Sequence, residues 1–307
     1  MAYLMTVRGP LDAAQAGLIL PHEHLFVDWR PPTTPGYAEA EIADVRRRLD
    51  PDLREIKELG VGTLVECTPP IIGRNIEILR ALSEAHDLHI VAAAGAYRDP
   101  LVPSPLREQR VAALADWMVG ELEQGVGETG IRCGFIKLGA SDEGLTALEE
   151  RFLRAAARAS QRTGAAIASH TLAGAVALRQ MDILAEEGLA LSRFVWVHAH
   201  VEPDLALHRE AAARGAWLEY DAIGDPGTPD ATFVDLVQHA RAQGFGRQVM
   251  LSQDAGWYTA GEPEAEMRTL GYLVRTFLPV LQQAGVSDAD IRMLTADNPA
   301  RAFAIGA

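Results

Sequence analysis

The sequence predicts an α/β fold, a (β/α)8 TIM barrel, and three observations lead to this prediction. The chain has 307 residues, a length that such barrels reach as one unit, so we expect a single domain over residues 1–307. Short apolar runs recur along the whole chain. Segments of helix length that are rich in Ala, Leu, Arg and Glu lie between these runs. Strands that alternate with helices indicate βαβ units and hence a parallel sheet.

The apolar runs are predicted to be strands. Most of them are continuous rather than alternating, which is typical of parallel strands that are covered on both faces. In chain order the runs are 16–22, 61–67, 88–95, 133–138, 165–170, 193–198, 216–221 and 248–254. Because there are eight such runs, a closed barrel is favoured over an open doubly wound sheet.

The segments between the runs predict helices and loops. The predicted helices include 42–59, 75–86, 148–164, 173–188 and 203–215. The last three end at glycine, as helix C-termini often do. Stretches rich in Pro and Gly follow the first, third, seventh and eighth strands, at 31–40, 98–106, 224–230 and 254–264. Loops at this end of a barrel build the substrate site in enzymes of this architecture.

Composition excludes some classes of function. The chain has 28 Lys and Arg against 42 Asp and Glu, which gives a net charge of −14. Because this charge repels phosphate backbones and anionic membranes, we expect neither a nucleic-acid nor a membrane partner. The two cysteines, Cys67 and Cys133, lie beside apolar runs and predict buried free thiols in a reducing compartment. The first residues lack a secretory-signal pattern, so a cytoplasmic protein is expected.

Five side chains of metal-ligand type fall at the carboxyl ends of predicted strands. His22 and His24 close the first strand, and residues two apart on a strand point the same way. His170, His198 and Asp254 end the fifth, sixth and eighth strands. Barrel closure would bring all five together, and imidazole and carboxylate ligands suit zinc and related divalent ions.

Each of these residues also has a structural alternative. A lone histidine at a strand end is more often a hydrogen-bonded structural residue than a ligand, and it is the joint placement that favours a metal site. His200 shares the side of His198 and could replace it as ligand. We choose His198 because it directly ends the apolar run. We expect the remaining histidines to be solvated; they are His86, His89, His208 and His239.

Lys137 lies inside the apolar run that forms the fourth strand. A buried ammonium is costly unless it is paired or neutral. A neutral amine can react with carbon dioxide to give a carbamate, an anion that could bridge two cations. The alternative is a lysine that extends to the barrel mouth and binds an anionic substrate. Position alone leaves both possibilities open.

Two metals in such a centre would share a hydroxide of lowered pKa, and one of them could polarise the oxygen under attack. Asp254 would then serve both as a ligand and as the acceptor of the proton from that hydroxide. The sequence carries no GxSxG, HExxH or P-loop motif. Because the hydroxide would be the nucleophile, a serine or cysteine nucleophile is not required.

The residues above, in this order, resemble the phosphotriesterase family of the amidohydrolase superfamily. The likeness covers nearly the whole chain; its motifs are LPHEH (20–24), TLVECTPPIIGRNIEIL (63–79), HIVAAAGAYRDP (89–100), GFIKLGAS (134–141), ASHT (168–171), VWVHAH (195–200), ARGAWLEYD (213–221), LSQD (251–254) and NPARAF (298–303). The resemblance implies an amidohydrolase-like barrel with two divalent metal ions, usually Zn²⁺. It also makes a homodimer the expected assembly.

The same resemblance assigns the ligands. His22 and His24 with Asp254 would hold the buried metal, and His170 with His198 the more exposed one. The lysine that matches Lys137 is carboxylated in the family, as N6-carboxylysine, and bridges the two ions. The catalytic residues implied are therefore Asp254 and Lys137.

The substrate follows less directly, because the resemblance covers enzymes that hydrolyse lactones, phosphorylated sugar lactones, acyl esters, amides and organophosphate triesters. Tyr97 falls where the family places an aromatic residue beside the substrate, although it could be a core aromatic. Arg74 is a second candidate for substrate binding, together with Arg98 and Asp28; for all three a loop salt bridge is the alternative. These candidate residues do not by themselves identify the reaction.

Two departures bear on the reaction. Ala222 stands where organophosphate hydrolases resemble one another in having histidine and quorum-quenching lactonases have arginine. Val201 stands where an organophosphate hydrolase has aspartate. We therefore expect a lactonase or esterase that attacks a lactone, sugar lactones included, or a carboxylic ester with a metal-bridging hydroxide. The alternatives are an aryldialkylphosphatase-type phosphotriesterase and a metal-binding barrel without catalysis.

Two other kinds of metal-dependent barrel are disfavoured. Nucleases that also begin with an HxH pair use a glutamate on the fourth strand, and the acidic surface offers no track for a phosphate backbone. Mononuclear deaminases carry a glutamate three residues after the fifth-strand histidine, where this chain has Ala173.

Overall fold

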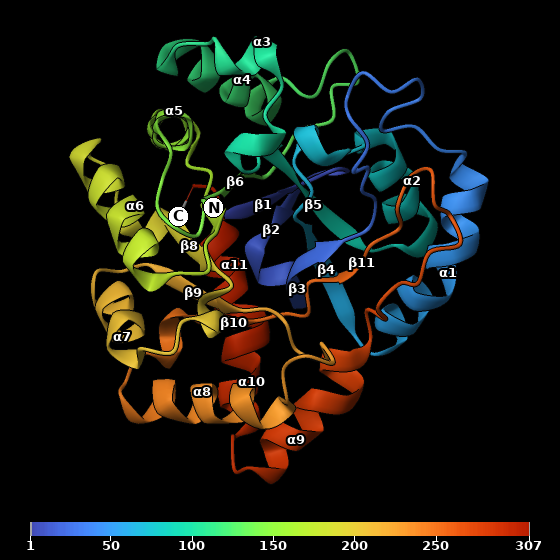
Figure 1. Ribbon diagram of the computed structural model, residues 1–307. Helices are drawn as coiled ribbons and strands as arrows, with labels where there is room; N and C mark the ends of the chain where they lie inside the picture. Colours follow the sequence, from blue (N-terminus) through green and yellow to red (C-terminus); the bar gives the residue numbers. More distant parts are fainter. Residues whose placement is uncertain (1, 307) are drawn as a thin grey trace.

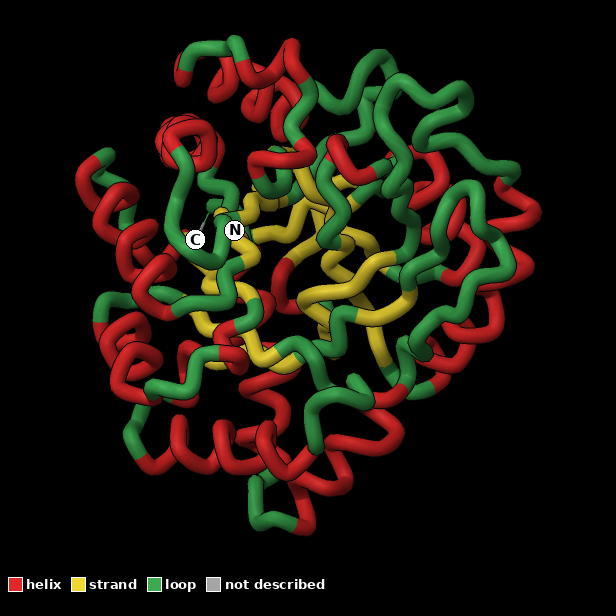
Figure 2. The backbone as a smooth tube through the Cα atoms, in the orientation of Figure 1, coloured by secondary structure: helices red, strands yellow, loops and turns green. Residues whose placement is uncertain are grey.

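A ring of parallel strands surrounded by helices forms the centre of the molecule (Figures 1 and 2). This computed structural model describes residues 2–306. The strands follow one another in sheet order as they do in the chain. They are β3 (Leu18–His24), β4 (Val61–Glu66), β5 (His89–Gly95), β6 (Phe135–Gly139), β7 (Ile167–His170), β8 (Phe194–Val197), β9 (Trp217–Tyr220) and β10 (Val249–Leu251). The predicted α/β barrel fold is thereby confirmed.

The ring closes where the last strand meets the first. Strand β10 pairs with β9, and its continuation β11 (Ala255–Gly256) pairs with β3 in parallel. Between the two, the backbone N–H of Asp254 donates to the carbonyl of His22 at 3.0 Å. Closure therefore sets the end of the eighth strand directly beside the end of the first, and both carry predicted ligands.

The outer layer consists of helices that follow the strands and cover the sheet (Figure 1). The main ones are α1 (Ile42–Glu58), α2 (Ile76–His86), α4 (Val111–Glu123), α5 (Ala147–Thr163), α6 (Gly174–Glu186), α7 (Leu205–Ala213) and α8 (Asp230–Ala242). Shorter helices are α3 (Ser104–Arg107), α9 (Leu278–Gln283), α10 (Asp288–Arg292) and α11 (Asn298–Phe303). Helix α1 shows the principle: its buried residues recur every three or four positions, as one face of a helix requires, at Val45, Leu49, Leu53 and Ile56.

The barrel wall separates two apolar cores. The outer core joins the helices to the outward-facing side chains of the strands. The inner core fills the N-terminal half of the barrel with inward-facing side chains, among them Ile19, Val65, Val91, Phe135, Val195 and Met250. Because the interior is packed with side chains there, the barrel has no open pore, and only its C-terminal end is left for a site.

A hairpin that the sequence analysis did not predict closes the N-terminal end of the barrel. Strands β1 (Tyr3–Thr6) and β2 (Gly9–Asp12) pair antiparallel across a two-residue turn. Leu4 joins the inner core, and so does Phe303 of α11, which packs edge-on against Phe135 at 5.3 Å between ring centroids. Each strand has only four residues, and β2 contains Gly-Pro, which is unfavourable in a strand interior.

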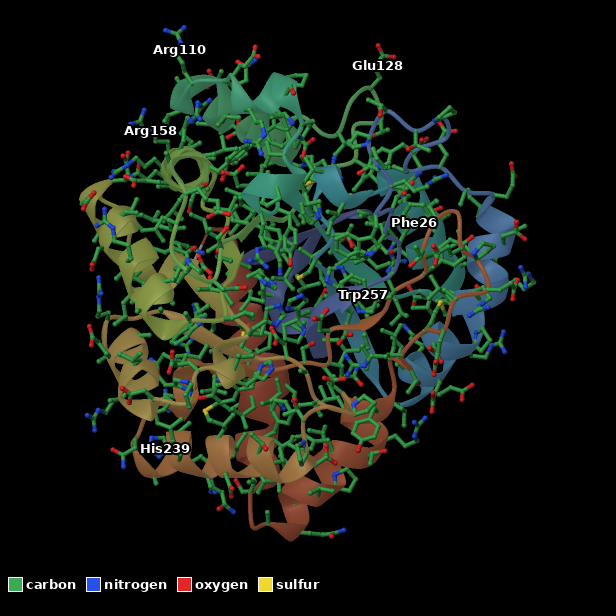
Figure 3. All side chains as sticks on the ribbon, in the orientation of Figure 1. Phe26, Arg110, Glu128, Arg158, His239 and Trp257 are labelled. Atoms are coloured by element: carbon green, nitrogen blue, oxygen red, sulfur yellow. The ribbon has the colours of Figure 1, made fainter. Side chains whose placement is uncertain are left out.

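The remaining sequence expectations concern thiols and the surface. Cys67 and Cys133 are both free and buried, as predicted. Within residues 2–306, no helix combines the length and the hydropathy that crossing a bilayer demands. Figure 3 shows charged side chains such as Arg110, Glu128 and Arg158 at the edge of the molecule.

Candidate metal centre

A pocket of about 60 Å³ lies at the C-terminal ends of the barrel strands. The structure brings all six predicted ligands into its lining. The lining consists of His22, His24, Trp29, Ile72, Tyr97, Lys137, His170, His198, Asp254 and Trp257. A larger hollow crosses the opposite end of the barrel, but none of the histidines in the described residues 2–306 lines it.

A β-bulge aims the two histidines of β3 into the barrel. Leu20 pairs with Leu64 and Glu23 with Glu66, so three steps along β3 oppose two steps along β4. The extra residue reverses the alternation of inward and outward side chains after it. Ile19 therefore belongs to the inner core and, beyond the bulge, the even-numbered His22 and His24 point inward.

Two other ligand candidates continue the regular alternation of their strands. On β6, Phe135 of the inner core is followed two residues later by Lys137. On β7, Ala168 is followed in the same way by His170. Since successive side chains of a strand face opposite sides, an apolar residue below and a polar one above share the interior face.

His198 reaches the pocket by a different route. Val197 belongs to the inner core, so regular alternation would send the next side chain outward. His198 instead adopts a left-handed backbone conformation, with φ 64° and ψ 28°, which turns its ring inward. Asp254 also has a positive φ, 52°. Non-glycine residues adopt this region rarely, and where they do the strain is often connected with a functional site.

The ligand atoms lie close enough to share cations. The Nε2 atom of His24 lies 3.3 Å from Oδ1 of Asp254, and Nε2 of His22 lies 3.7 Å from the same oxygen. The Nζ atom of Lys137 is 3.3 Å from His22 Nε2. One ligand atom each from His22, His24 and Asp254 fall within 4.8 Å of one another. His170 and His198 form the second group, with ring centroids 4.5 Å apart.

Polar atoms in this pocket lack hydrogen-bond partners, and this observation tests whether metal ions fit. The Nε2 atom of His170 and the Oδ1 atom of Asp254 are buried and unpartnered within residues 2–306. An unsatisfied buried lone pair is costly, and a bound cation would satisfy it. Imidazole nitrogen and carboxylate oxygen are also the donors that divalent zinc prefers. The residues present therefore fit a metal centre.

The protonation of the imidazoles agrees with this fit. Burial lowers the pKa of His24 well below its ordinary value, and the positive charges of His22 and Lys137 lower it further. Burial, followed by the charges of His198 and Lys137, lowers the pKa of His170 to about 2. Both rings are therefore neutral near pH 7, and a neutral imidazole has the lone pair that a metal ion needs.

The Nδ1 atoms of the four histidines contact a second group of polar side chains. His22 Nδ1 lies 2.9 Å from Asp221 Oδ2 and 3.1 Å from Glu219 Oε2, and His198 Nδ1 lies 2.8 Å from Asp221 Oδ1. His24 Nδ1 contacts the hydroxyl of Thr68 at 2.8 Å, and His170 Nδ1 that of Tyr97 at 3.0 Å. Metal-binding histidines commonly donate their other N–H to such acceptors, which leaves Nε2 free for the metal.

The carboxylates of β9 have different environments. Burial would raise the pKa of Asp221, but the charge of His198 and hydrogen bonds with the surrounding histidines hold it well below its ordinary value. Burial raises the pKa of Glu219 to about 7 in spite of its contact with His22. Asp221 therefore carries the negative charge of this pair. Because its oxygens face Nδ1 atoms, we interpret His22, His198 and Asp221 as a hydrogen-bonded group rather than a separate cation site.

Two tryptophans form walls of the pocket that the sequence analysis did not identify. The Trp257 ring stacks on His24 at 3.8 Å between centroids, and Trp29 lies beside Trp257 at 5.9 Å. The indole N–H of Trp257 donates to the carbonyl of Asp254 at 2.8 Å. In the view of Figure 3, Trp257 lies over the barrel. Its place in the predicted loop 254–264 was the only signal in the sequence.

The predicted substrate residues separate into two groups. Tyr97 lines the pocket and contacts His170. Arg74 does not line it: its guanidinium is buried outside the pocket and forms a salt bridge with Glu121 at 2.7 Å. The prediction of Arg74 as a substrate residue is therefore wrong, because Glu121 of α4, distant in sequence, already binds the charge. Arg98 and Asp28 also form salt bridges, with Asp142 and Arg30.

Two further histidines clarify the sequence analysis. His200, the competitor of His198, is absent from the pocket lining, and its Nδ1 lies 3.2 Å from Asp221 Oδ1. His208 was expected to be solvated, and that expectation is wrong. It is buried, with its ring nitrogens 3.0 Å from the Tyr220 hydroxyl and 3.0 Å from the Glu202 carbonyl.

Comparisons with known proteins identify the family and the fold. A model of the Phosphotriesterase family matches residues 2–303. A phosphotriesterase homology protein of Mycobacterium tuberculosis is 35% identical over an alignment of 323 residues, which covers 99% of this chain and 98% of that protein. A solved mutant of a PTE-like lactonase from Deinococcus radiodurans has a TM-score of 0.88 and 30% identity, with 98% of this chain and 99% of that chain covered. The phosphotriesterase homology protein of Escherichia coli, solved with phosphate in its active site, has a TM-score of 0.83 and 29% identity, with 95% and 100% covered.

Proposed function

Because the chain belongs to the phosphotriesterase family, whose members are metal-dependent hydrolases, we propose that it hydrolyses an uncharged lactone or carboxylic ester, sugar lactones included. The observation that carries the proposal is the convergence of six ligand candidates in one pocket whose other walls are largely apolar. Family membership implies a binuclear metal site. His22, His24 and Asp254 would hold one ion, His170 and His198 the other, and Lys137 would lie between them.

Two divalent ions bound there, Zn²⁺ being the metal we propose, would supply Lewis-acid polarisation and lower the pKa of a water molecule. The protein's own contribution is a buried, preorganised set of imidazoles, of which burial keeps those of His24 and His170 neutral, and one carboxylate. Asp254, with an unpartnered oxygen at the pocket, is placed to accept a proton from the attacking water. The water oxygen bonds to the carbonyl carbon, the C–O bond of the ester breaks, and the leaving alkoxide takes up a proton.

Lys137 supports the proposal through its surroundings. Its side chain is 2% exposed, and within the described residues it forms no salt bridge, its nearest polar partner being the ring of His22 at 3.3 Å. A buried ammonium without a carboxylate is unfavourable. We propose that the neutral amine adds to carbon dioxide, forming an N–C bond and releasing one proton, so that an N6-carboxylysine replaces the cation with an anion. That anion is the group a pair of cations requires.

The pocket favours uncharged substrates, because no free arginine of residues 2–306 is available there to bind an anionic group. No arginine of the described residues lines the pocket. Three arginines of the loops that follow the strands are bound elsewhere: Arg30 by Asp28, Arg98 by Asp142, and Arg268 by the carbonyls of Asp254 and Ile223. The lining offers aromatic and aliphatic surface instead, from Trp29, Ile72 and Trp257. A phosphorylated or sulfonated substrate would find no free arginine there, whereas an apolar ring or acyl chain would be covered.

The absence of two polar groups argues against an organophosphate hydrolase. Val201 is 46% exposed and does not line the pocket, and neither does Ala222. Neither side chain can take up or pass on a proton. Tyr97 contributes a hydroxyl at the pocket wall, and burial raises its pKa to about 12, so it can donate a hydrogen bond to a substrate oxygen.

A substrate panel tests the proposed reaction. Protein loaded with zinc or manganese is assayed against neutral lactones, sugar lactones, phosphorylated sugar lactones, acyl esters and paraoxon. We expect the highest kcat/KM with a neutral lactone or ester and weak or no turnover of paraoxon. Strong turnover of paraoxon alone, or a preference for the phosphorylated sugar lactones, would contradict the proposal.

Lys137 and Lys57 are the only two lysines of the chain, which supplies a matched pair of variants. Lys137→Ala is expected to lose bound metal and activity, with partial rescue by short-chain carboxylic acids. Lys57→Ala, at an exposed salt bridge with Asp87, should change neither. After equilibration with ¹³C-bicarbonate, the carbamate carbon signal should be present in the Lys57 variant and absent from the Lys137 variant. Full metal occupancy of Lys137→Ala would exclude the bridging role.

A further inference from the structure

One carboxylate contacts the histidines of both proposed ion sites. Asp221 follows β9 and is fully buried. Its Oδ2 atom lies 2.9 Å from Nδ1 of His22, and its Oδ1 atom lies 2.8 Å from Nδ1 of His198. The Oδ2 atom also accepts the backbone N–H of His198 at 3.1 Å. Since His22 and His198 are assigned to different ions, Asp221 touches a ligand of each.

The neighbouring carboxylate on β9 contacts only one of them. Glu219 lies two residues before Asp221 and therefore on the same face of the strand. Its Oε2 atom is 3.1 Å from Nδ1 of His22, and its Oε1 atom is buried without a partner. The two carboxylates are thus similarly buried, but Glu219 contacts one ligand histidine whereas Asp221 contacts two.

The contact at Nδ1 decides which ring nitrogen is free. A neutral imidazole has one N–H, and an acceptor placed at Nδ1 holds the proton there. The lone pair is then on Nε2, which in His22 faces the pocket, 3.3 Å from Lys137 Nζ and 3.7 Å from Asp254 Oδ1. Without the acceptor, the ring can turn or take the other tautomer, and Nε2–H would then face the ion.

We propose that Asp221 is a positioning residue that fixes the ring tautomers of His22 and His198 together and so links the two ion sites, while Glu219 acts on His22 alone. The inference rests on the binuclear site of the proposed function but not on the substrate. Its readout is therefore the binding of metal ions rather than hydrolysis, and the substrate panel can fail while this pattern holds.

The test compares Asp221→Ala with Glu219→Ala in the full-length protein. Metal-free protein is titrated with Co²⁺, and the two dissociation constants are measured by competition with a chelator. Loss of a carboxylate behind a ligand histidine typically weakens metal binding about 10–100-fold. We expect Asp221→Ala to raise both dissociation constants by a factor in this range. Glu219→Ala should raise only one of them.

A third variant, Asp221→Asn, keeps the shape of the side chain and guards against a loss of folding. Its amide oxygen is expected at the Oδ2 position, which receives two donors, so the NH2 group would face His198 Nδ1. Asn has one acceptor oxygen and therefore restores the tautomer of His22 but not that of His198. In Asp221→Asn, the dissociation constant of the ion held by His22 should be near the wild-type value, whereas that of the ion held by His198 should stay raised. The double variant that combines Asp221→Asn with Glu219→Ala should raise both constants.

Proton NMR of the Co²⁺-loaded protein gives an independent readout. The exchangeable Nδ1 protons of metal-bound histidines give paramagnetically shifted proton signals. We expect two such signals to be lost in Asp221→Ala and no more than one in Glu219→Ala. If Asp221→Ala raises only one constant, or if Asp221→Asn binds both ions as tightly as the wild type, Asp221 does not link the sites.

Discussion

The lower and upper halves of the barrel interior are built from the same strands but are stabilised by different interactions. In the lower half, apolar side chains such as Phe135 and Met250 pack with Leu4 and Phe303 from outside the barrel. Two residues further along the same strands, Lys137 and Ser252 are buried polar groups. Dispersion and burial dominate below, and hydrogen bonds and charge above. The comparison indicates that the lower half supplies stability and the upper half chemistry.

The largest expected effect on stability comes from the lower half. Phe135 is fully buried and packs against Phe303. Phe135→Ala is expected to lower the free energy of unfolding by about 3–5 kcal/mol, because the site loses apolar contacts and is left with a cavity. Denaturant unfolding measures the loss. In the folded protein at low temperature, metal content should be unchanged, and a loss of metal equal to that of Lys137→Ala would show that the two halves are not independent.

The buried carboxyl groups of the upper half should make the free energy of unfolding depend on pH. Burial raises the pKa of Glu66 to about 7, although hydrogen bonds from Thr68 and the backbone of Leu25 oppose the rise. For a carboxyl whose pKa is raised on folding, the stabilisation is complete below the unfolded pKa of about 4.5 and is lost as pH rises through 7. Glu66→Gln should therefore reduce this loss, by up to about 1 kcal/mol per pH unit in that interval.

The measurement for Glu66→Gln is denaturant unfolding of metal-free protein at several pH values between 4.5 and 7.5. Glu23 and Glu219, whose pKa values burial also raises to about 7, contribute with the same sign. The slope should thus decrease without vanishing. Glu128→Gln, at an exposed loop position, is the control and should leave the slope unchanged. An unchanged slope in Glu66→Gln would mean that this carboxyl is charged when folded.

The sequence predicted the barrel well because one strong signal repeats. Most of the eight runs are continuously apolar, a helix-length segment separates each from the next, and the structure has a strand in each. The placement of Lys137, His170 and Asp254 followed from the same signal, since each lies near the end of its run. Regular alternation along β6 and β7 is sufficient to turn the first two inward.

Other features depend on tertiary contacts that local patterns do not carry. The inward direction of His22 requires a bulge in β3, and that of His198 a left-handed backbone. Arg74 was misassigned because its partner Glu121 lies 47 residues away. Asp221 and Trp257 were not identified, since their roles come from contacts with histidines on other strands. Sequence analysis therefore identifies the side chains that are available for chemistry, but not the partners that they contact in the fold.

The smallest expected effect concerns the reactivity of the two cysteines, which tests whether the lower half of the barrel depends on the metal centre. Cys67 belongs to the inner core and Cys133 to the outer core, and burial raises the pKa of both thiols. A thiol reacts as the thiolate and only where reagent can reach it, so neither should react with a disulfide reagent in the native protein. If the lower half is stable without the metal centre, removal of metal by a chelator should leave both rates limited by unfolding. Faster reaction of Cys67 alone would show that water enters the barrel past His22 and that the ions help to close the inner core.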